Sequence, residues 1–177
     1  MSKKILLGLG SKAQIGKDYA AEKLKSEFDI ERIAFADELK KDLSILFKQS
    51  NLDFEALCAE PDIKKIIRPL MVTYGQIMRT FNADIWVDRA LANKEFTHQV
   101  TIITDVRFPN EVARLKALGG VYIEIDSNVP PANETEALYS PIMSGLADYK
   151  VTNNFDGNYL HSMAELIETL LQEEDQK

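Results

Sequence analysis

The sequence predicts an α/β fold, in which a parallel sheet of five strands carries helices on both faces. Short apolar runs alternate along the chain with segments whose apolar residues recur at helical spacing. The apolar runs are nearly continuous, as expected for strands that are buried on both faces. Strands that alternate with helices imply right-handed crossovers and therefore a parallel sheet. At 177 residues, of which 45% are apolar, the chain suits one domain spanning residues 1–177.

The predicted strands are five apolar runs: KILLGL (4–9), ERIAFA (31–36), QVTIIT (99–104), VYIEID (121–126) and DYKVTN (148–153). Apolar spacing predicts helices over residues 16–27, 38–49, 68–82, 84–96, 110–120 and 158–172. Asp37 would be the N-cap of the second helix, and Pro69 would lie in the first turn of the third.

The core would comprise residues 1–37, 98–126 and 148–177, and two insertions would interrupt it, at 38–97 and 127–147. Within the first insertion, residues 50–66 are expected to form loops and a short helix. The second contains three prolines and no lysine or arginine, so we expect a loop-like excursion with at most a short helix.

Composition excludes several classes of function. The net charge is −7 and no basic cluster stands out, which argues against binding to nucleic acid polymers. The one cysteine, Cys58, cannot form an internal disulfide, as is usual in a reducing cytoplasm. The first apolar run is too short for a signal peptide or a membrane span, so we expect a cytoplasmic protein without a membrane partner.

A candidate phosphate-binding loop lies in KKILLGLGSKAQIGKDYAAEKL, residues 3–24. The phosphate-loop pattern is Gly, four residues, then Gly-Lys and Ser or Thr, between a strand and a helix. Gly16 and Lys17 match its second half, whereas the first glycine position falls on Ser11 and the hydroxyl position holds Asp18. Backbone amides at the start of the helix would bind a phosphate that Lys17 could also reach.

The neighbouring residues support this interpretation. Gly10 lies one position before the expected glycine, and Lys12 would add a second cation to the loop. Asp18 has no hydroxyl to offer Mg²⁺, but its carboxylate could hold the metal directly or through water. The alternative is an ordinary strand-to-helix turn with surface lysines.

A second group of candidate residues lies in TIITDVRFPNE, residues 101–111. Ligands of parallel sheets bind beyond the carboxyl ends of the strands, where Asp105 and Arg107 are expected. Asp105 could orient Mg²⁺ or accept a hydrogen bond from a substrate, and Arg107 could clamp a phosphate. The alternative is an ion pair and a cap at the end of a strand.

The first insertion supplies a third set of candidates: Asp37, Arg68, Gly75, Arg79 and Trp86. Residues 68 and 79 are eleven apart, about three helical turns, so their side chains would share a face and could grip an acceptor phosphate. Solvated helix charges are an equally good interpretation of the two arginines. Trp86 is more typical of a core position than of a base-stacking surface, and Gly75 of close helix packing.

Taken together, the motifs resemble those of bacteriophage-type deoxynucleoside monophosphate kinases. The similar segments follow one another over nearly the whole chain: GLGSKAQIGKD, FADELKK, RPLMVTYGQIMRTFNADIW, TIITDVRFPNEVARLKALGG, NETEALY and ADYKVTNNFDGNYLHS. Animal phosphomevalonate kinases share the Gly-Lys-Asp loop and a similar Asp-x-Arg at a strand end, so they are the nearest competitor.

The resemblance implies an adenylate-kinase-like P-loop fold whose core holds ATP, with a monophosphate-binding insertion at 38–97 and a lid at 127–147. It implies transfer of the γ-phosphate of ATP to a deoxynucleoside monophosphate with Mg²⁺. The catalytic residues would be Lys12, Lys17, Asp105 and Arg107, with Asp18 and Asp105 at the metal. ATP would bind at Gly10, Ser11, Lys12, Ala13, Gly16, Lys17, Asp18, Tyr19 and Asn153. The acceptor would bind at Asp37, Lys40, Arg68, Gly75, Gln76, Arg79, Trp86, Arg107 and Glu136.

The sequence departs from the family pattern in ways that matter for the chemistry. Ser11 replaces the usual first loop glycine, and Asn133 stands where a histidine is expected, which leaves the role of Glu136 open. The lid also lacks arginine, so the charge on the migrating phosphoryl group would have to be met by Lys12, Arg107 or Mg²⁺.

Two other functions remain open at this stage: phosphorylation of another small acceptor such as phosphomevalonate, and nucleotide binding without catalysis. Tyr74, Gln76 and Trp86 favour a nucleobase, whereas the altered loop and the arginine-free lid favour a silent binder. The resembled family also implies small-molecule nucleotides as ligands, a possible homodimer and, if the protein is phage-encoded, the host cytoplasm.

Overall fold

The computed structural model describes residues 3–10, 12–92 and 94–173. The chain divides into two compact units, each described here by itself. Unit 1 comprises Met1–Ile33 and Lys94–Lys177, and unit 2 comprises Ala34–Asn93. The roles predicted for the insertions at 38–97 and 127–147 stay predictions.

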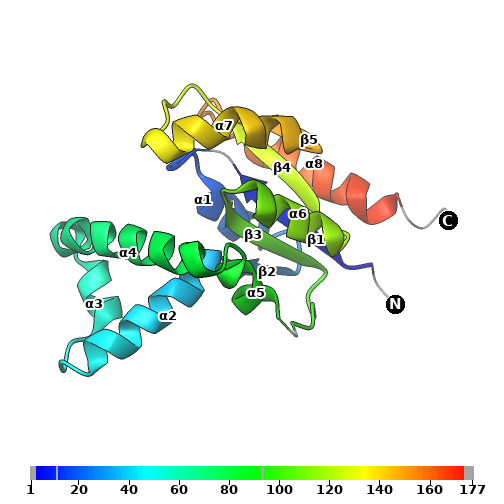
Figure 1. The fold of residues 1–177 in the computed structure, drawn as a ribbon. Coiled ribbons are helices and arrows are strands. Elements are labelled where there is room, and N and C mark those ends of the chain that lie inside the picture. Colours follow the sequence, from blue (N-terminus) through cyan, green and yellow to red (C-terminus); the bar gives the residue numbers. More distant parts are fainter. Residues whose placement is uncertain (1–2, 11, 93, 174–177) are drawn as a thin grey trace. The chain divides into compact units, whose positions relative to one another are not determined.

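Unit 1 contains a sheet of five strands, with the order β2-β3-β1-β4-β5 and parallel pairing throughout (Figure 1). The strands are β1 (Ile5–Gly10), β2 (Ile30–Ile33), β3 (Val100–Val106), β4 (Val121–Asp126) and β5 (Tyr149–Thr152). Successive strands of the chain are joined through helices or through unit 2, so the crossover topology predicted from the alternating pattern is confirmed.

Helices cover both faces of this sheet: α1 (Lys17–Leu24), α6 (Pro109–Ala117), α7 (Glu134–Leu146) and α8 (Asn158–Gln172). On one face, the apolar side chains of β1 pack with those of α1 and α8 in a single core, in which Leu7 and Leu9 are fully buried. On the other face, α6 packs against β1 and β4, and α7 against α6 and β4. The α/β class with helices on both faces is therefore confirmed.

Unit 2 is helical and contains α2 (Phe35–Lys48), α3 (Phe54–Ala59), α4 (Pro61–Phe81) and α5 (Ile85–Leu91). Asp53 caps α3 by accepting hydrogen bonds from two backbone amides. Trp86 of α5 is buried and donates its indole N–H to the carbonyl of Gly75 on α4 at 3.3 Å. A side chain at Gly75 would lie 2.8 Å from Leu39 of α2, so glycine permits this close helix packing.

Two predicted helix starts are wrong. Asp37 is not an N-cap, because α2 begins at Phe35 with Ala34 as its cap and places Asp37 in the first turn. Pro69 lies inside α4 and not in its first turn, which Pro61 occupies. Pro61, at the first helical position, is the proline that marks the start of the helix. Pro69 has no N–H to donate, so α4 continues past it without that hydrogen bond and is held by tertiary packing.

Other boundaries also shift. β3 runs through Asp105 and ends at Val106, two residues beyond the predicted end at Thr104. Residues 134–146 form a helix of 13 residues, although Pro141 lies inside it, so the second insertion is mostly helical. Its N-cap is Asn133, whose side chain accepts from the amide of Glu136 at 2.9 Å. In the described part of the chain, every helix is too short or too polar to span a lipid bilayer.

We predict that Gly10→Ala destabilises unit 1. A methyl group there would lie 1.9 Å from the hydroxyl oxygen of Tyr122, a fully buried side chain of β4. The free energy of unfolding should fall by about 1–3 kcal/mol, the usual cost of overpacking. Thermal unfolding of the full chain measures it.

The matched control is Gly145→Ala in α7, where an added methyl group meets no atom within 4 Å. This control should be neutral or stabilising by up to about 1 kcal/mol, because alanine favours helix. Equal stability of the two variants would contradict the close approach of Gly10 and Tyr122.

Candidate functional site

The loop between β1 and α1 is held in shape by groups from the far end of the chain. Gly16, the N-cap of α1, has a φ of 84°, a left-handed conformation that suits glycine. The buried side chain of Asn153 donates to the carbonyl of Ile15 at 3.0 Å, and the hydroxyl of Tyr159 donates to the carbonyl of Gly16 at 3.3 Å. These bonds fix the carbonyls of the loop just before the helix N-terminus.

Asn153, which was predicted to bind ATP, bonds to backbone groups at both ends of its side-chain amide. Its amide nitrogen bonds to the loop, and its amide oxygen accepts from the amide of Phe155 at 2.8 Å. Asn153 therefore positions the loop, and its direct contact with ATP stays a prediction. Tyr19 is exposed on α1 beneath the ammonium group of Lys23, and Ser11 lies outside the described residues.

Lys17 is a buried cation at the start of α1. Its ammonium group donates to the carbonyl of Lys12 at 2.5 Å, which draws the side chain back over the loop. Burial and then the positive charge of Arg107 lower the pKa of Lys17 to about 8, against the opposing effects of nearby carboxylates. A buried ammonium group with a lowered pKa gains stability from any anion placed beside it.

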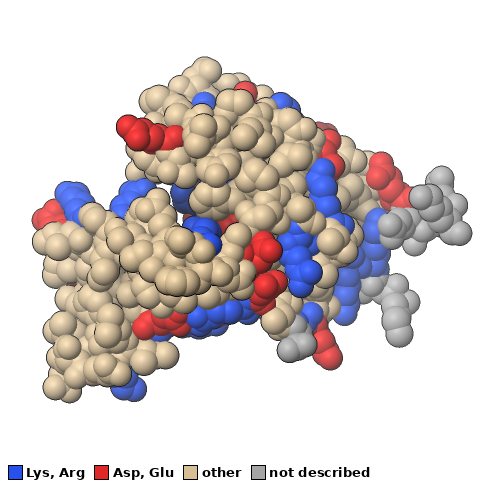
Figure 2. Space-filling model, in the orientation of Figure 1, with Lys and Arg blue, Asp and Glu red and all other residues tan. Residues whose placement is uncertain are grey.

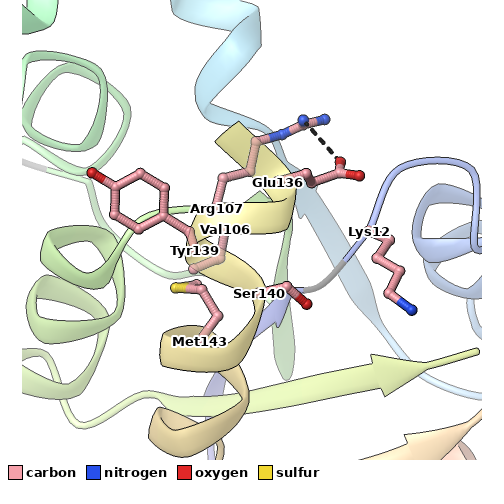
Figure 3. A pocket seen from close by; sticks show the side chains of 7 residues that line it. All are labelled: Lys12, Val106, Arg107, Glu136, Tyr139, Ser140 and Met143. Carbon is pink, nitrogen blue, oxygen red and sulfur yellow. Dashed lines mark ion pairs between the residues drawn. The ribbon is translucent and has the colours of Figure 1, made fainter. Parts of the chain in front are cut away.

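A carboxylate of α7 lies against the same loop. Glu136 accepts a hydrogen bond from the amide of Ala13 at 2.8 Å, and its same oxygen lies 3.7 Å from a guanidinium nitrogen of Arg107. Figure 3 shows Arg107 and Glu136 directed toward one another. The amide of Ala13 and the guanidinium group of Arg107 thus lie on one anionic oxygen. A backbone amide and a guanidinium group are also the groups that bind the oxygens of a phosphate.

These side chains line a pocket within unit 1 (Figure 3). Its lining residues are Lys12, Val106, Arg107, Glu136, Tyr139, Ser140 and Met143. Lys12 comes from the loop and donates to the carbonyl of Ser127 at 3.1 Å. Tyr139 comes from α7 and packs edge-on against Phe108, with ring centroids 5.2 Å apart. The pocket is therefore lined mainly by apolar atoms, and the ion pair of Arg107 and Glu136 lies at it.

Glu111 fixes the backbone that presents Arg107. Its buried carboxylate accepts from the amide of Arg107 at 2.6 Å and from the amide of Phe108 at 3.1 Å. The exposed guanidinium group is thus carried on a turn that is anchored from the first turn of α6. Glu111 was not among the predicted site residues, although a glutamate three residues after the N-cap is a known signal of a helix start.

The two predicted metal ligands have different surroundings. Asp18 accepts from the hydroxyl of Thr104 at 2.7 Å and from the guanidinium group of Arg32 at 2.8 Å. Burial would raise the pKa of Asp18, but these hydrogen bonds outweigh it and hold the pKa below its ordinary value. Asp105 is half-buried at the end of β3 and acts electrostatically on Lys17.

Among the described residues, no group of three or more His, Cys, Asp or Glu side chains could hold a metal ion. Two carboxylates still suit Mg²⁺, because this ion is commonly held by one or two protein carboxylates together with substrate phosphates and water. The residues therefore fit a metal that arrives with a phosphorylated substrate. Arg32 and Thr104 were missed in the sequence analysis, since only the fold brings them to Asp18.

Unit 2 contains the other predicted residues. Arg68 and Gln76 are exposed on α4, and Arg79 is half-buried there and has a partner. Lys40 pairs with Asp37 at 2.7 Å within α2. These five remain candidates for an acceptor site.

Two predicted acceptor residues have structural roles in unit 2. Trp86 and Gly75 are buried against one another, so neither presents a face to a ligand. Tyr74, which favoured a base in the sequence analysis, donates its hydroxyl to Asp42 at 2.9 Å. Asp42 is also paired with Arg89 at 2.6 Å.

On the face shown in Figure 2, most of the surface is uncharged, and the Lys and Arg side chains have Asp and Glu side chains near them. This distribution and the net charge of −7 suit a site for a small anion.

A comparison with curated protein sequences found no match. Among solved structures, the chain resembles shikimate kinase from Bacteroides thetaiotaomicron, with 11% sequence identity over 95% of this chain and 98% of that chain, at a TM-score of 0.47. A similarity of this degree adds nothing to the topology already described.

The family model described as phosphomevalonate kinase matches residues 9–120, which is more than half of the 177 residues. The matched segment includes the loop after β1, Lys17, Asp105 and Arg107. The matching family is thus the one named above as the nearest alternative to the bacteriophage-type kinases. Membership in the bacteriophage-type family is not confirmed. The chain belongs to the phosphomevalonate kinase family and is a phosphotransferase with a P-loop-kinase-like α/β fold.

Proposed function

We propose that the protein transfers the γ-phosphoryl group of ATP to a deoxynucleoside 5′-monophosphate. The observation that carries the proposal is the oxygen of Glu136, which the Ala13 amide and Arg107 share beside the buried Lys17. Phosphoryl transfer needs such preorganised cations and amides and little covalent chemistry from the protein.

On the donor side, Lys17, Lys12 and the loop amides would hold the triphosphate. Asp18 and Asp105 would hold Mg²⁺, which when bound supplies positive charge to the phosphate oxygens. Arg107 would meet the charge on the migrating group, a task that lid arginines cannot perform here because residues 127–147 contain none. Closure over the loop would exclude water and so suppress hydrolysis of ATP.

On the acceptor side, Arg68 and Arg79 would bind the monophosphate, whose oxygen is already a nucleophile. Gln76 lies between them in sequence and is exposed, and its amide can both donate to and accept from a base edge. Trp86 and Tyr74 are occupied within unit 2, so base recognition would depend on Gln76. The motif resemblance described above supports a deoxynucleotide as the acceptor.

A second candidate acceptor is phosphomevalonate, which the matching family model favours. An isoprenoid phosphate would use the same anion clamps and would leave Gln76 without a role. A third possibility, nucleotide binding without catalysis, is disfavoured by the two carboxylates and several arginines that a silent site would not need.

The test is a product assay with ATP and Mg²⁺ across all deoxynucleoside and ribonucleoside monophosphates and phosphomevalonate. We expect a diphosphate from at least one deoxynucleotide. Product from phosphomevalonate alone would replace the proposed acceptor with the second candidate, and nucleotide affinity without any product would reject catalysis. Lys17→Met, which removes the buried charge, should lower the rate on the order of 10²–10⁴-fold and so exclude a contaminating kinase.

We predict that binding of ATP is coupled to proton uptake. The pKa of Lys17 is about 8 without a ligand, so near pH 8.5 much of this group is neutral. Triphosphate oxygens beside it would raise the pKa, and the protein would then take up a proton on binding. Calorimetric titration at this pH in buffers of different ionisation enthalpy measures the uptake.

Lys17→Met is the control, since it should abolish the coupling near pH 8.5. Uptake that persists unchanged in this variant, or proton release by the wild type, would contradict the placement of the triphosphate beside Lys17.

We further predict that Glu136→Gln binds ATP more tightly. The carboxylate of Glu136 occupies the Ala13 amide and lies next to Arg107, so it competes with a phosphate for both. The neutral amide should compete less, and the gain should be several-fold, corresponding to about 1 kcal/mol. Dissociation constants from titration calorimetry measure it.

Glu134→Gln is the matched control, because Glu134 is an exposed carboxylate in the same first turn of α7. It should leave the affinity unchanged. Weaker binding in Glu136→Gln would mean that this carboxylate helps to hold the nucleotide or its metal and does not compete with the nucleotide.

A further inference from the structure

The carboxylate of Asp18 is held through one of its two oxygens. Oδ1 accepts a hydrogen bond from the hydroxyl of Thr104 at 2.7 Å and from Nε of Arg32 at 2.8 Å. A second guanidinium nitrogen, Nη2, lies 2.8 Å from the same oxygen. Among the described residues, no hydrogen bond or ion pair reaches the other oxygen, Oδ2. The side chain of Asp18 is 69% exposed, so Oδ2 is the oxygen that is open to a ligand.

The pairing of β2 with β3 brings the two donors together. Arg32 lies opposite Ile102 of β3, and Thr104 follows Ile102 by two residues. Alternate residues of a strand share a face of the sheet, so Thr104 lies on the same face as Ile102. Ile102 belongs to the core that also contains Leu24 of α1, so this is the face that α1 covers. The hydroxyl and the guanidinium group therefore meet the first turn of α1, where Asp18 lies.

Burial of a hydroxyl group does not by itself explain the contact of Thr104 with a carboxylate. Thr104 is 2% exposed, and most buried hydroxyl groups find a partner. However, Thr101 of the same strand is 1% exposed, and its hydroxyl bonds to no group in the part of the chain that the structure describes. β3 thus tolerates a buried hydroxyl without a partner, and the bond to Asp18 calls for a further reason.

The arrangement suits a carboxylate that is kept ready for a cation. P-loop enzymes hold Mg²⁺ through a hydroxyl of the loop and an acidic residue elsewhere in the site. In this chain a carboxylate, that of Asp18, takes the place of the loop hydroxyl. The hydroxyl of Thr104 comes from the end of β3 and bonds to that carboxylate. Mg²⁺ demands near-ideal octahedral geometry, which one oxygen in a fixed position can serve.

Groups that hold a metal ligand from behind also set its affinity for the metal. Hydrogen bonds to a ligating carboxylate fix its orientation, and loss of one usually lowers metal affinity about 10–100-fold. Without Thr104 and Arg32, the exposed side chain of Asp18 would take several rotamers and would lose that freedom when it bound a metal. With them, Oδ2 is oriented before the metal arrives.

We propose that Thr104 and Arg32 are positioning residues that fix Oδ2 of Asp18 for Mg²⁺ bound together with a nucleotide. The inference rests on the proposed function, since it takes Asp18 as a ligand of a metal that arrives with ATP. Arg32 also repels a cation, so its removal would have two opposing effects on metal affinity. Thr104 is neutral and therefore gives the cleaner test.

The test is the effect of Mg²⁺ on the binding of ADP, measured by titration calorimetry of the full chain without an acceptor. We define the metal effect as the dissociation constant of ADP in EDTA divided by that in excess Mg²⁺. Thr104→Val should lower the metal effect about 10–100-fold relative to the wild type and leave the affinity in EDTA unchanged. Thr104→Ser keeps the hydroxyl and should retain the metal effect of the wild type.

Thr101→Val is the matched control, because it removes an equally buried hydroxyl of β3 that has no partner among the described residues. It should retain the metal effect of the wild type. Thr104→Ala removes the same hydroxyl as Thr104→Val with a smaller side chain. The test therefore stands if valine at this position prevents folding, which circular dichroism detects.

A double-mutant cycle shows whether Thr104 acts through Asp18. Asp18→Ala should lower the metal effect by removing the proposed ligand. In the Asp18→Ala background, Thr104→Val should lower it no further, because a residue that acts only through another adds nothing once that one is gone. Additive losses would overturn the positioning role.

An unchanged metal effect in Thr104→Val would also overturn the proposal. So would an equal loss in Thr101→Val, or weaker binding of ADP to Thr104→Val by the same factor with and without Mg²⁺, which would indicate a merely structural role. A wild type that binds no ADP would overturn it together with the proposed function. A metal effect that Thr104→Val lowers as expected, without a diphosphate product from any deoxynucleotide, would support the positioning role and reject the proposed function alone.

Discussion

The register of β1 against β3 is the constraint on which the site of unit 1 depends. Gly10 lies opposite Val106, so the loop that follows Gly10 and the turn that carries Arg107 start side by side. The register shifts between Gly8 and Gly10, where β3 contributes one additional residue. Such a bulge redirects the end of a strand. The loop amides, Lys17 and Arg107 are thus brought together by backbone pairing before any side chain interacts.

The electrostatics of the site follow from that convergence. Placing Lys17 in a buried position near Arg107 costs free energy, which carboxylates at the same edge partly offset. Glu136 supplies the contact to the loop from α7, and Asp18 is held by Thr104 and Arg32. In the proposed reaction, a phosphorylated ligand would take over the compensation that Glu136 provides, and exchange of one anion for another would require little reorganisation of the cations.

Unit 2 uses its polar aromatic residues for its own stability. The hydroxyl of Tyr74 and the guanidinium group of Arg89 both bind Asp42, and Trp86 bonds to the backbone of α4. The 21-residue helix α4 presents two further sides, one with Arg68 and Arg79 and one with exposed apolar residues such as Ile66 and Phe81.

The sequence by itself indicated five strands of a parallel sheet, because buried parallel strands read as short apolar runs that alternate with helical segments. It did not give the strand order, and it extended the second strand to residue 36, where α2 has already begun at Phe35. β4 and α8 were predicted with their observed bounds. It also indicated Lys17 and Arg107 as neighbours, since both follow strands whose carboxyl ends must meet. The starts of α2 and α4 were missed, because cap and proline signals occur at several nearby positions and packing chooses among them.

Only the tertiary structure decided which polar residues are occupied. Asn153 and Glu111 support the backbone of the site through contacts between distant segments. The sequence favoured a core position for Trp86 and close helix packing for Gly75, and the structure adds that the two contact one another because α5 returns across α4. The same limit applies to the exposed apolar residues of α4, such as Ile66 and Phe81. Periodicity identifies an apolar side of a helix, but only packing shows whether that side is covered, because exposure is a property of the neighbours and not of the residue.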